Sequence, residues 1–161
     1  VVIDGLNILD LNNYEIAKIR NQKIGFVFQF HHLLSEFTAL ENVLMPAWIG
    51  NLNSQKKDEA VNLFSELNLS SKMDFYPNQL SGGERSRVAL LRGIINKPKI
   101  LLADEPTGNL DEKNALTLID LLKKINKDFN QAIIITTHNP DVAKLGCKRF
   151  NLVNGILKTM R

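Results

Sequence analysis

The sequence contains a single cysteine, Cys147, among its 161 residues. One thiol excludes a framework of intrachain disulfides and favours a reducing compartment. No apolar run approaches the roughly 18 residues that a membrane-spanning helix needs, so none is predicted. The sequence also lacks a phosphate-binding loop of the form G-x-x-x-x-G-K-[ST]. Any phosphate site formed by these residues must therefore be built in another way.

What is present indicates a globular protein with one domain, or one core plus a small lobe. Apolar residues make up 44% of the chain, which is enough for a core, and 23% charged residues with five prolines argue against disorder. The formal net charge is +3, with a pI near 9.0. This charge is compatible with an acidic partner such as phosphate, a lipid surface or nucleic acid, and equally with an ordinary lysine-rich surface.

The apolar pattern predicts strands at both ends of the chain and helices between them. We expect hairpins over 1–9 and 149–160, strands over 24–28, 100–103 and 132–137, and helices over 12–20, 40–48, 56–67, 81–95 and 115–125. The strands at 100–103 and 132–137 read as buried on both faces. Pro46 should bend or break its helix, and residues 76–78 should form a loop.

This order predicts an α/β core with a parallel sheet and right-handed crossovers, interrupted by an all-helical insertion. The expected division is a partial core over 1–30, a helical subdomain over 31–97, and the rest of the core over 98–161.

Two carboxylates, Asp104 and Glu105, come directly after the strand at 100–103. Sites in open parallel sheets lie at the carboxyl ends of strands. A strand-terminal Asp can face Mg²⁺, while the adjacent Glu can orient or deprotonate a water molecule. The alternative is structural, with Asp104 capping a turn and Glu105 merely solvated.

Two further polar residues end predicted strands. His138 follows the strand at 132–137, and it should lie near Asp104 and Glu105 if the two strands are neighbours. A neutral imidazole there could donate to a phosphate oxygen, although a lone histidine at a strand end is more often a structural hydrogen-bonding group. Gln29 ends the strand at 24–28, where it could touch a ligand in the core and report to the insertion, or simply terminate the strand.

Residues 79–88 read QLSGGERSRV. Ser81 and Glu84 have the spacing of a capping box, which alone would explain them structurally. Gly82 and Gly83 are harder to explain, since each glycine inside a helix costs roughly 1 kcal/mol. They would expose bare backbone N–H groups at the positive end of a helix, which favours close approach by phosphate.

Taken together, these motifs resemble those of ABC-type ATPases, in the same order along the chain. The matching residues are 80–84 (LSGGE, the signature segment), 101–106 (LLADEP, the Walker B strand), 109–111 (NLD, the D-loop), His138 (the switch histidine) and Gln29 (the Q-loop). The resemblance implies a P-loop NTPase-like α/β fold with an inserted helical subdomain. It also implies that the chain is N-terminally incomplete, because the Walker A phosphate loop would lie before Val1.

The resemblance implies a role for each motif residue, with ATP and Mg²⁺ as ligands. Glu105 would be the catalytic base, and His138 would sense the γ-phosphate. Gln29 would also sense the γ-phosphate and would help Asp104 to bind Mg²⁺. In a head-to-tail dimer, the ATP of the second subunit would be contacted by Ser81, Gly82 and Gly83, and Asp111 would link the two sites. The motif also shows departures, such as Ser86 where the family often has Gln.

A longer stretch, residues 24–46 (IGFVFQFHHLLSEFTALENVLMP), is similar to the ATPase subunit of the lipoprotein-releasing transporter, the LolD type. ATP hydrolysis alone does not demand these residues, which could also simply pack the core. The resemblance implies integral membrane permease partners, no nucleic acid, and a peripheral position on the cytoplasmic side of the inner membrane.

Three alternatives remain open from the sequence. The chain could serve a macrolide or peptide exporter or a cell-division ABC complex. It could be a truncated subunit that binds partners without hydrolysing ATP. A chromosome-maintenance or DNA-repair ATPase is disfavoured, because such proteins carry long coiled coils where this chain has the short span from Gln29 to Leu80.

Overall fold

The computed structural model describes residues 1–3 and 5–160, with the backbone alone for residues 53–55. Its central feature is a three-stranded parallel sheet of order β3-β4-β5, formed by β3 (Ile24–Phe28), β4 (Ile100–Asp104) and β5 (Ala132–Thr136). Phe28 pairs with Asp104, and Asp104 pairs with Thr136. The carboxyl ends of all three strands are therefore level, so the segments that follow them meet at one edge, as the sequence predicted.

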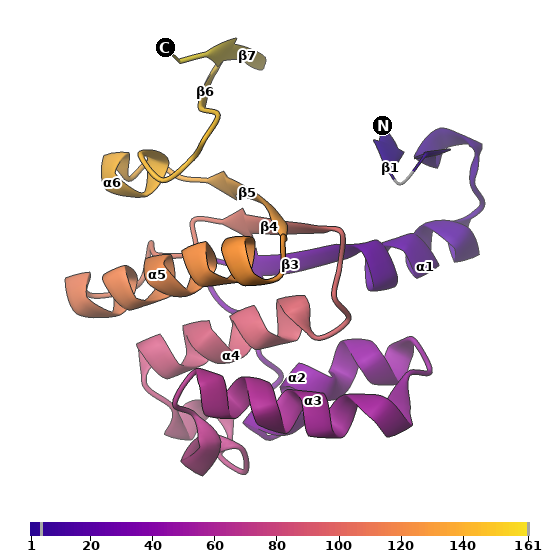
Figure 1. The fold of residues 1–161 in the computed structure, drawn as a ribbon, viewed down its shortest axis with the longest axis vertical. Coiled ribbons are helices and arrows are strands. Elements are labelled where there is room, and N and C mark those ends of the chain that lie inside the picture. The colour runs from indigo at the N-terminus through magenta and orange to yellow at the C-terminus, as the bar shows by residue number, and fades with distance from the viewer. Residues whose placement is uncertain (4, 161) are drawn as a thin grey trace.

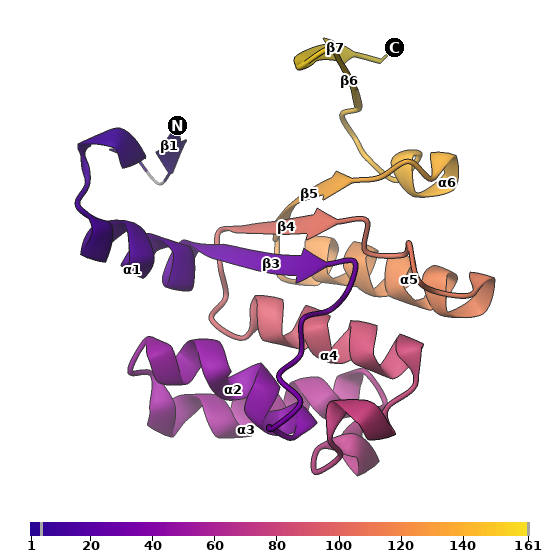
Figure 2. The same cartoon turned by 180° about the vertical axis from the view of Figure 1, so that it is seen from behind.

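Helices form layers beneath one face of this sheet. Figures 1 and 2 show α4 and α5 against the sheet, with α2 and α3 beyond α4. The helices are α1 (Asn13–Lys23), α2 (Ala39–Ile49), α3 (Asn53–Glu66), α4 (Gly82–Ile94), α5 (Glu112–Asp128) and α6 (Pro140–Ala143), with 3₁₀ turns η1 (Ile8–Asp10), η2 (Ser70–Lys72) and η3 (Pro77–Gln79). The backbone of every residue between β3 and β4 is described, and none of these residues forms a strand, which agrees with a helical insertion. The insertion's exact limits, 31–97, remain a prediction.

The core is centred on α4, which lies between the sheet and α2. Val88, Leu90 and Leu91 are fully buried there. Gly25 in β3 and Gly93 in α4 let the two backbones approach closely: a Cβ on Gly25 would overlap the Gly93 carbonyl oxygen. Burial of this apolar stripe is the main force holding α4 against the sheet.

Helix α2 differs from its prediction. Pro46 lies inside α2, and the helix runs through it to Ile49 without a break. The prediction of a break was wrong because the surrounding structure retains the helix. Asn21 in α1 donates from Nδ2 to the Pro46 carbonyl oxygen at 2.8 Å, and the flanking Val43, Leu44 and Ala47 are buried. Residues 77 and 78, which were expected in a loop, lie in the 3₁₀ turn η3.

The strands are buried on one face only, which corrects a second prediction. Leu101 and Ala103 point toward the helices and are buried, whereas Ile134 on the other face is 53% exposed and Phe26 is 37% exposed. Phe26, Leu102 and Ile134 are register partners across the three strands. The apolar runs therefore identified the strands correctly. They could not show whether one face or both faces of the sheet are covered by the described residues.

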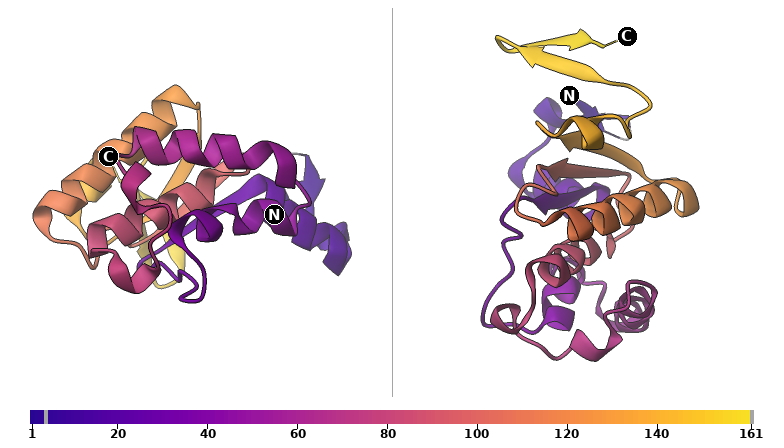
Figure 3. Two further views of the ribbon diagram at one scale, coloured as in Figure 1. Left: turned by 90° about the horizontal axis from the view of Figure 1, so that it is seen from below. Right: turned by 90° about the vertical axis from the view of Figure 1, so that its left-hand side faces the viewer.

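The two hairpins match their predictions. One pairs β1 (Val2–Ile3) with β2 (Leu6–Asn7), and the other pairs β6 (Phe150–Val153) with β7 (Ile156–Thr159). The second turns at Asn154 and Gly155, which have φ values of 51° and 77°, as a type I′ turn requires. Figure 3 shows this hairpin projecting beyond the sheet at the C-terminal end. Among the described helices, none has the length and apolar character needed to cross a bilayer.

Candidate functional site

The site begins where β4 ends, at Asp104 and Glu105. The Asp104 carboxylate accepts a hydrogen bond from Thr136 Oγ1 at 2.5 Å. Glu105 has a φ of +42°, and its N–H donates to the Thr136 carbonyl oxygen at 2.9 Å. A non-glycine residue in this left-handed region is uncommon and often found at functional sites. The turn makes the two adjacent carboxylates diverge, so that Asp104 stays exposed while Glu105 lies against the segment after β5.

Glu105 and His138 are in direct contact. Glu105 Oε1 lies 2.6 Å from His138 Nδ1 and accepts from the His138 N–H at 2.8 Å. Thr137 Oγ1 donates to Glu105 Oε2 at 3.2 Å. The Glu105 side chain is 20% exposed and that of His138 is 81% exposed. Glu105 is thus held by several donors rather than merely solvated, and His138 Nδ1, not Nε2, is the ring nitrogen that contacts it.

Gln29 lies at the end of the neighbouring strand, β3, and pairs with the D-loop. Its Nε2 donates to Asn109 Oδ1 at 3.4 Å, and Asn109 Nδ2 donates to the Gln29 carbonyl oxygen at 3.2 Å. Gly108 leaves room for this pair, since a Cβ there would lie 2.8 Å from Gln29 Nε2. The Gln29–Asn109 pair was not predicted from the sequence, because the two residues are 80 positions apart.

The residues at the strand ends suit Mg²⁺ in part. Asp104 and Gln29 offer oxygen ligands, and Mg²⁺ typically takes one or two carboxylates together with water and substrate phosphates. Among the described residues, no group of three His, Cys, Asp or Glu side chains could hold a metal alone. Asp104 and Gln29 would therefore hold Mg²⁺ only jointly with water and phosphate oxygens.

The signature segment forms the predicted capping box at the start of α4. Ser81 Oγ accepts from the Glu84 N–H at 3.3 Å, and Glu84 Oε2 accepts from the Ser81 N–H at 2.7 Å. Gly82 and Gly83 form the first turn of the helix. Because α4 leads back to the start of β4, its N-terminus lies at the same end of the sheet as the strand-end residues. Its hydrogen bonds hold it as a preformed turn with its amides at the helix end.

Asp111 is the N-cap of α5. Its Oδ1 accepts from the Asn114 N–H at 2.8 Å, and its Oδ2 accepts from Asn114 Nδ2 at 2.7 Å. These two donations from Asn114 hold the pKa of the Asp111 carboxyl below its ordinary value. The sequence analysis missed Asn114, although the Asp-x-x-Asn spacing at a helix start could have indicated it.

The chain just after Gln29 is fastened to α4, which sequence reasoning also missed. Arg92 donates from Nη2 to the His31 carbonyl oxygen and from Nη1 to the His32 carbonyl oxygen, both at 2.5 Å. His31 and His32 both have positive φ values, 61° and 47°. Ser86 Oγ lies 3.4 Å from His31 Nε2, and both side chains are buried. The Q-loop and the signature helix are therefore physically joined.

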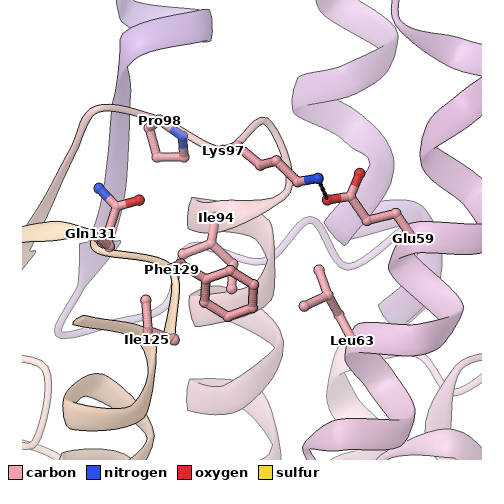
Figure 4. Close-up of a pocket in the computed structure, with 8 residues that line it drawn as sticks. All are labelled: Glu59, Leu63, Ile94, Lys97, Pro98, Ile125, Phe129 and Gln131. Carbon is pink, nitrogen blue, oxygen red and sulfur yellow. Dashed lines mark ion pairs between the residues drawn. The ribbon is translucent and has the colours of Figure 1, made fainter. Parts of the chain in front are cut away.

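Two cavities lie outside the strand-end cluster. A cleft of about 480 Å³ runs between α1, α2 and β3; its lining includes Arg20, Phe28, His32, Met45, Ile49 and Arg92. A smaller cavity of about 120 Å³, between α3, α4 and α5, is lined mainly by apolar side chains, with a Lys97–Glu59 ion pair of 3.0 Å at its edge (Figure 4). Only the larger cleft adjoins the Q-loop.

Comparison with known proteins agrees with this geometry. The family model described as "ABC transporter" matches residues 1–108. A lipoprotein-releasing system ATP-binding protein, LolD 2 of Chlorobium chlorochromatii, is 49% identical over 149 residues, covering 91% of this chain and 61% of that protein. LolD of Shewanella frigidimarina is 43% identical over 161 residues, covering 99% of this chain and 67% of that protein. The chain thus spans about two thirds or less of the length of these relatives.

Solved structures give the same result. The ATP-binding cassette MJ0796, in a dimeric post-hydrolysis state bound to ADP and Pi, has a TM-score of 0.86 and 36% identity, covering 99% of this chain and 72% of that one. A second dimeric structure of MJ0796, a bacterial ABC transporter cassette, has a TM-score of 0.84 and 37% identity, with the same coverage. The expected motifs, the matching fold and these relatives show that the chain belongs to the ABC transporter family of ATP-binding proteins and is of the LolD type.

Proposed function

We propose that this chain is part of an ATP-hydrolysing subunit that drives lipoprotein release from the inner membrane. The observation that carries the proposal is the joining of Asp104, Glu105 and His138 at one end of the sheet. Glu105 Oε1 is 2.6 Å from His138 Nδ1, and Asp104 is the next residue along the chain. General-base chemistry needs a carboxylate and a partner held in hydrogen-bonding geometry, and both are present.

Glu105 is proposed as the base toward the attacking water. Donors on one side, the His138 N–H and Thr137 Oγ1, hold its carboxylate in place. As the water attacks the γ-phosphorus, its proton would pass to a Glu105 oxygen, the bond from phosphorus to the β–γ bridging oxygen would break, and ADP would leave. His138 and Gln29 would contact the γ-phosphate, one from each flanking strand. Bound Mg²⁺, held by Asp104 and Gln29 with water, would supply charge neutralisation at the phosphates.

The active assembly is proposed to be a head-to-tail dimer. Ser81, Gly82 and Gly83 would contact the ATP held by the other subunit, and Asp111 would link the two sites. Support comes from the start of α4, where Ser81 is exposed and Gly82 is partly exposed, because backbone N–H groups at a helix N-terminus favour an anion. The MJ0796 structures, at 36–37% identity, are dimeric.

Membrane permease subunits are the proposed partners, with the protein peripheral on the cytoplasmic side of the inner membrane. The cleft between α1, α2 and β3 is the proposed docking place. Its apolar Met45 and Ile49 and its basic Arg20 suit a permease segment with apolar and acidic side chains. The cleft is lined by Phe28 and His32, which lie on either side of Gln29 in the chain, so docking there would reach the Q-loop.

Hydrolysis is tested with Glu105→Gln in the complete gene product. Loss of a general base should lower turnover by about 10²–10⁴-fold, while nucleotide binding persists. Glu112→Gln, on the exposed first turn of α5, is the matched control and should leave turnover unchanged. Near-normal turnover of Glu105→Gln would remove Glu105 from the role of base.

Sequencing of the coding DNA before Val1 adds a second test: an in-frame G-x-x-x-x-G-K-[ST] supports hydrolysis, and a stop codon contradicts it.

The partner is tested with Arg20→Glu. Reversing this charge should reduce co-purification of the permease subunits, while Lys18→Glu on the same helix, which is not among the residues lining the cleft, should not. Recovery of a macrolide or peptide exporter, or of cell-division proteins, in place of the lipoprotein system would contradict the proposed cargo. Unchanged co-purification would move the docking place away from this cleft.

A further inference from the structure

The side chain of Asn114 lies between the signature segment and the D-loop of the same chain. On one side, its Nδ2 donates to Asp111 Oδ2 at 2.7 Å. On the other side, its Oδ1, Cγ and Cβ are the three atoms nearest to the place where a Cβ on Gly83 would stand. Since Nδ2 is held by Asp111, the amide plane is oriented and Oδ1 must face Gly83.

The two signature glycines differ sharply in this respect. A Cβ on Gly83 would overlap Asn114 Oδ1, and it would lie 2.5 Å from Asn114 Cγ and 3.1 Å from Asn114 Cβ. A Cβ on Gly82 would meet only Leu110 Cδ2, at 4.0 Å. Residue 82 therefore has room for a methyl group, whereas residue 83 does not. Within this chain, a side chain at residue 83 would require the Asn114 side chain to move, because Asn114 occupies the space.

We propose that Asn114 is a positioning residue that sets the distance between Gly83 and Asp111, so that the signature turn and the D-loop move as one unit. This inference rests on the proposed function, in which Gly83 contacts the nucleotide of one site and Asp111 links it to the other. Contact of nucleotide with Gly83 shifts Asn114, and Asn114 shifts Asp111 through two hydrogen bonds. One subunit would thereby convey nucleotide contact at its signature segment to the dimer interface.

The proposal is tested by substituting each of the two contacting residues, Gly83 and Asn114, singly and together in the complete gene product. The variants are Gly83→Ala, Asn114→Ala and the double variant, with Gly82→Ala and Gly82→Ala/Asn114→Ala for comparison. The measurements are kcat, KM for ATP and, in a Glu105→Gln background, ATP-driven dimer formation by light scattering. Gly83→Ala should weaken dimer formation by about tenfold or more, a change of roughly 1.4 kcal/mol. The double variant should recover several-fold, because Asn114→Ala removes the overlapping amide.

No such recovery is expected for Gly82→Ala, because its methyl group does not meet Asn114. Asn114→Ala alone should lower kcat and dimer formation several-fold, because Asp111 loses a hydrogen-bond partner. The KM for ATP should change little, because the phosphate-binding loop of the complete gene product is not altered. Asn114→Asp, of equal size but without the donor, should not rescue Gly83→Ala. Asn126→Ala removes one amide hydrogen bond of 2.8 Å, to the Gln131 carbonyl oxygen, near the other end of α5, and should leave dimer formation unchanged.

Additive losses in the double variant would overturn the proposal, because the need for glycine at residue 83 would then come from the nucleotide alone. Thermal unfolding of the same variants separates this result from failure of the proposed function. The Gly83–Asn114 coupling should appear in unfolding midpoints even if the wild-type protein hydrolyses no ATP. Coupling in the midpoints without coupling in dimer formation would make Asn114 purely structural, which also overturns the proposal.

Discussion

The guanidinium of Arg92, in α4, donates to the backbone carbonyl oxygen of His31 at 2.5 Å, although the residues are 61 positions apart. Its other terminal nitrogen donates to the His32 carbonyl oxygen. Burial lowers the pKa of Arg92 from its usual value, but the guanidinium stays charged at neutral pH. The helix that begins at the signature segment thus holds the chain two residues after Gln29, at a point where two successive residues have left-handed backbones.

Replacement of Arg92 should loosen this attachment. Arg92→Ala should lower the free energy of unfolding by about 2–3 kcal/mol, the range for hydrogen bonds from a charged group with their acceptors left unpaired. Arg92→Lys should recover part of the loss, because a lysine cannot reach both carbonyls in the same fork. Urea unfolding measures the change. Arg20→Ala, at an exposed position, is the control, and an equal loss there would contradict the assignment.

Asn42 should be the most sensitive residue of the segment between β3 and α3. It is fully buried, accepts from the Leu34 N–H at 2.8 Å, and donates to the carbonyl oxygens of Leu34, Phe37 and Thr38. Asn42→Leu should therefore cost about 2–3 kcal/mol, since the Leu34 N–H and the Phe37 carbonyl oxygen lose their partner, whereas the Leu34 and Thr38 carbonyl oxygens keep backbone donors. Thermal unfolding tests this. A midpoint within a degree of wild type would show that these backbone groups find other partners.

Gly25 should not tolerate any side chain. A Cβ there would overlap the Gly93 carbonyl oxygen and lie 2.8 Å from Leu101 Cδ1, so β3 and α4 would have to separate. Gly25→Ala should destabilise the fold by about 2–3 kcal/mol through overpacking. Gly82→Ala, where a Cβ meets nothing closer than 4.0 Å, is the matched substitution and should change stability little. Equal effects of the two changes, measured by denaturant unfolding, would contradict the close approach.

The capping box of α4 should make stability depend on acid pH. The Ser81 N–H, which donates to the Glu84 carboxylate, and Lys72 nearby hold the pKa of Glu84 below its ordinary value. The folded pKa is thus below the unfolded value of about 4.3, so this stability is present above that pH and is lost as pH falls through the folded pKa.

Glu84→Gln should accordingly weaken the protein near neutral pH and flatten its stability profile below about pH 4.3. Unfolding midpoints between pH 6 and pH 3 measure this, with the exposed Glu66→Gln as control. A Glu84→Gln profile that keeps the wild-type slope below pH 4.3 would assign the acid sensitivity to other carboxylates.

Much of the fold followed from local pattern. The strand at 24–28, the helix after Ser81 with its capping box, and the hairpin over 149–160 were predicted correctly, because each depends on neighbours within a few positions. The strand-end placement of Asp104 and His138 also followed, since parallel strands bring their carboxyl ends to one edge. The continuity of α2 through Pro46 did not, because burial of Val43, Leu44 and Ala47 around the proline outweighs the local preference.

The sequence by itself determined the family motifs, the parallel core and the residues that meet at the sheet edge. Only the tertiary structure decided how those motifs are joined: Gln29 to Asn109, His31 to Arg92, and Gly83 to Asn114. The partners in these contacts lie about 30 to 80 positions apart, and no periodicity connects residues so far apart. Their meeting depends on the packing of α4 and α5 beneath the strands, which is set by the burial of many apolar side chains from distant segments in one core.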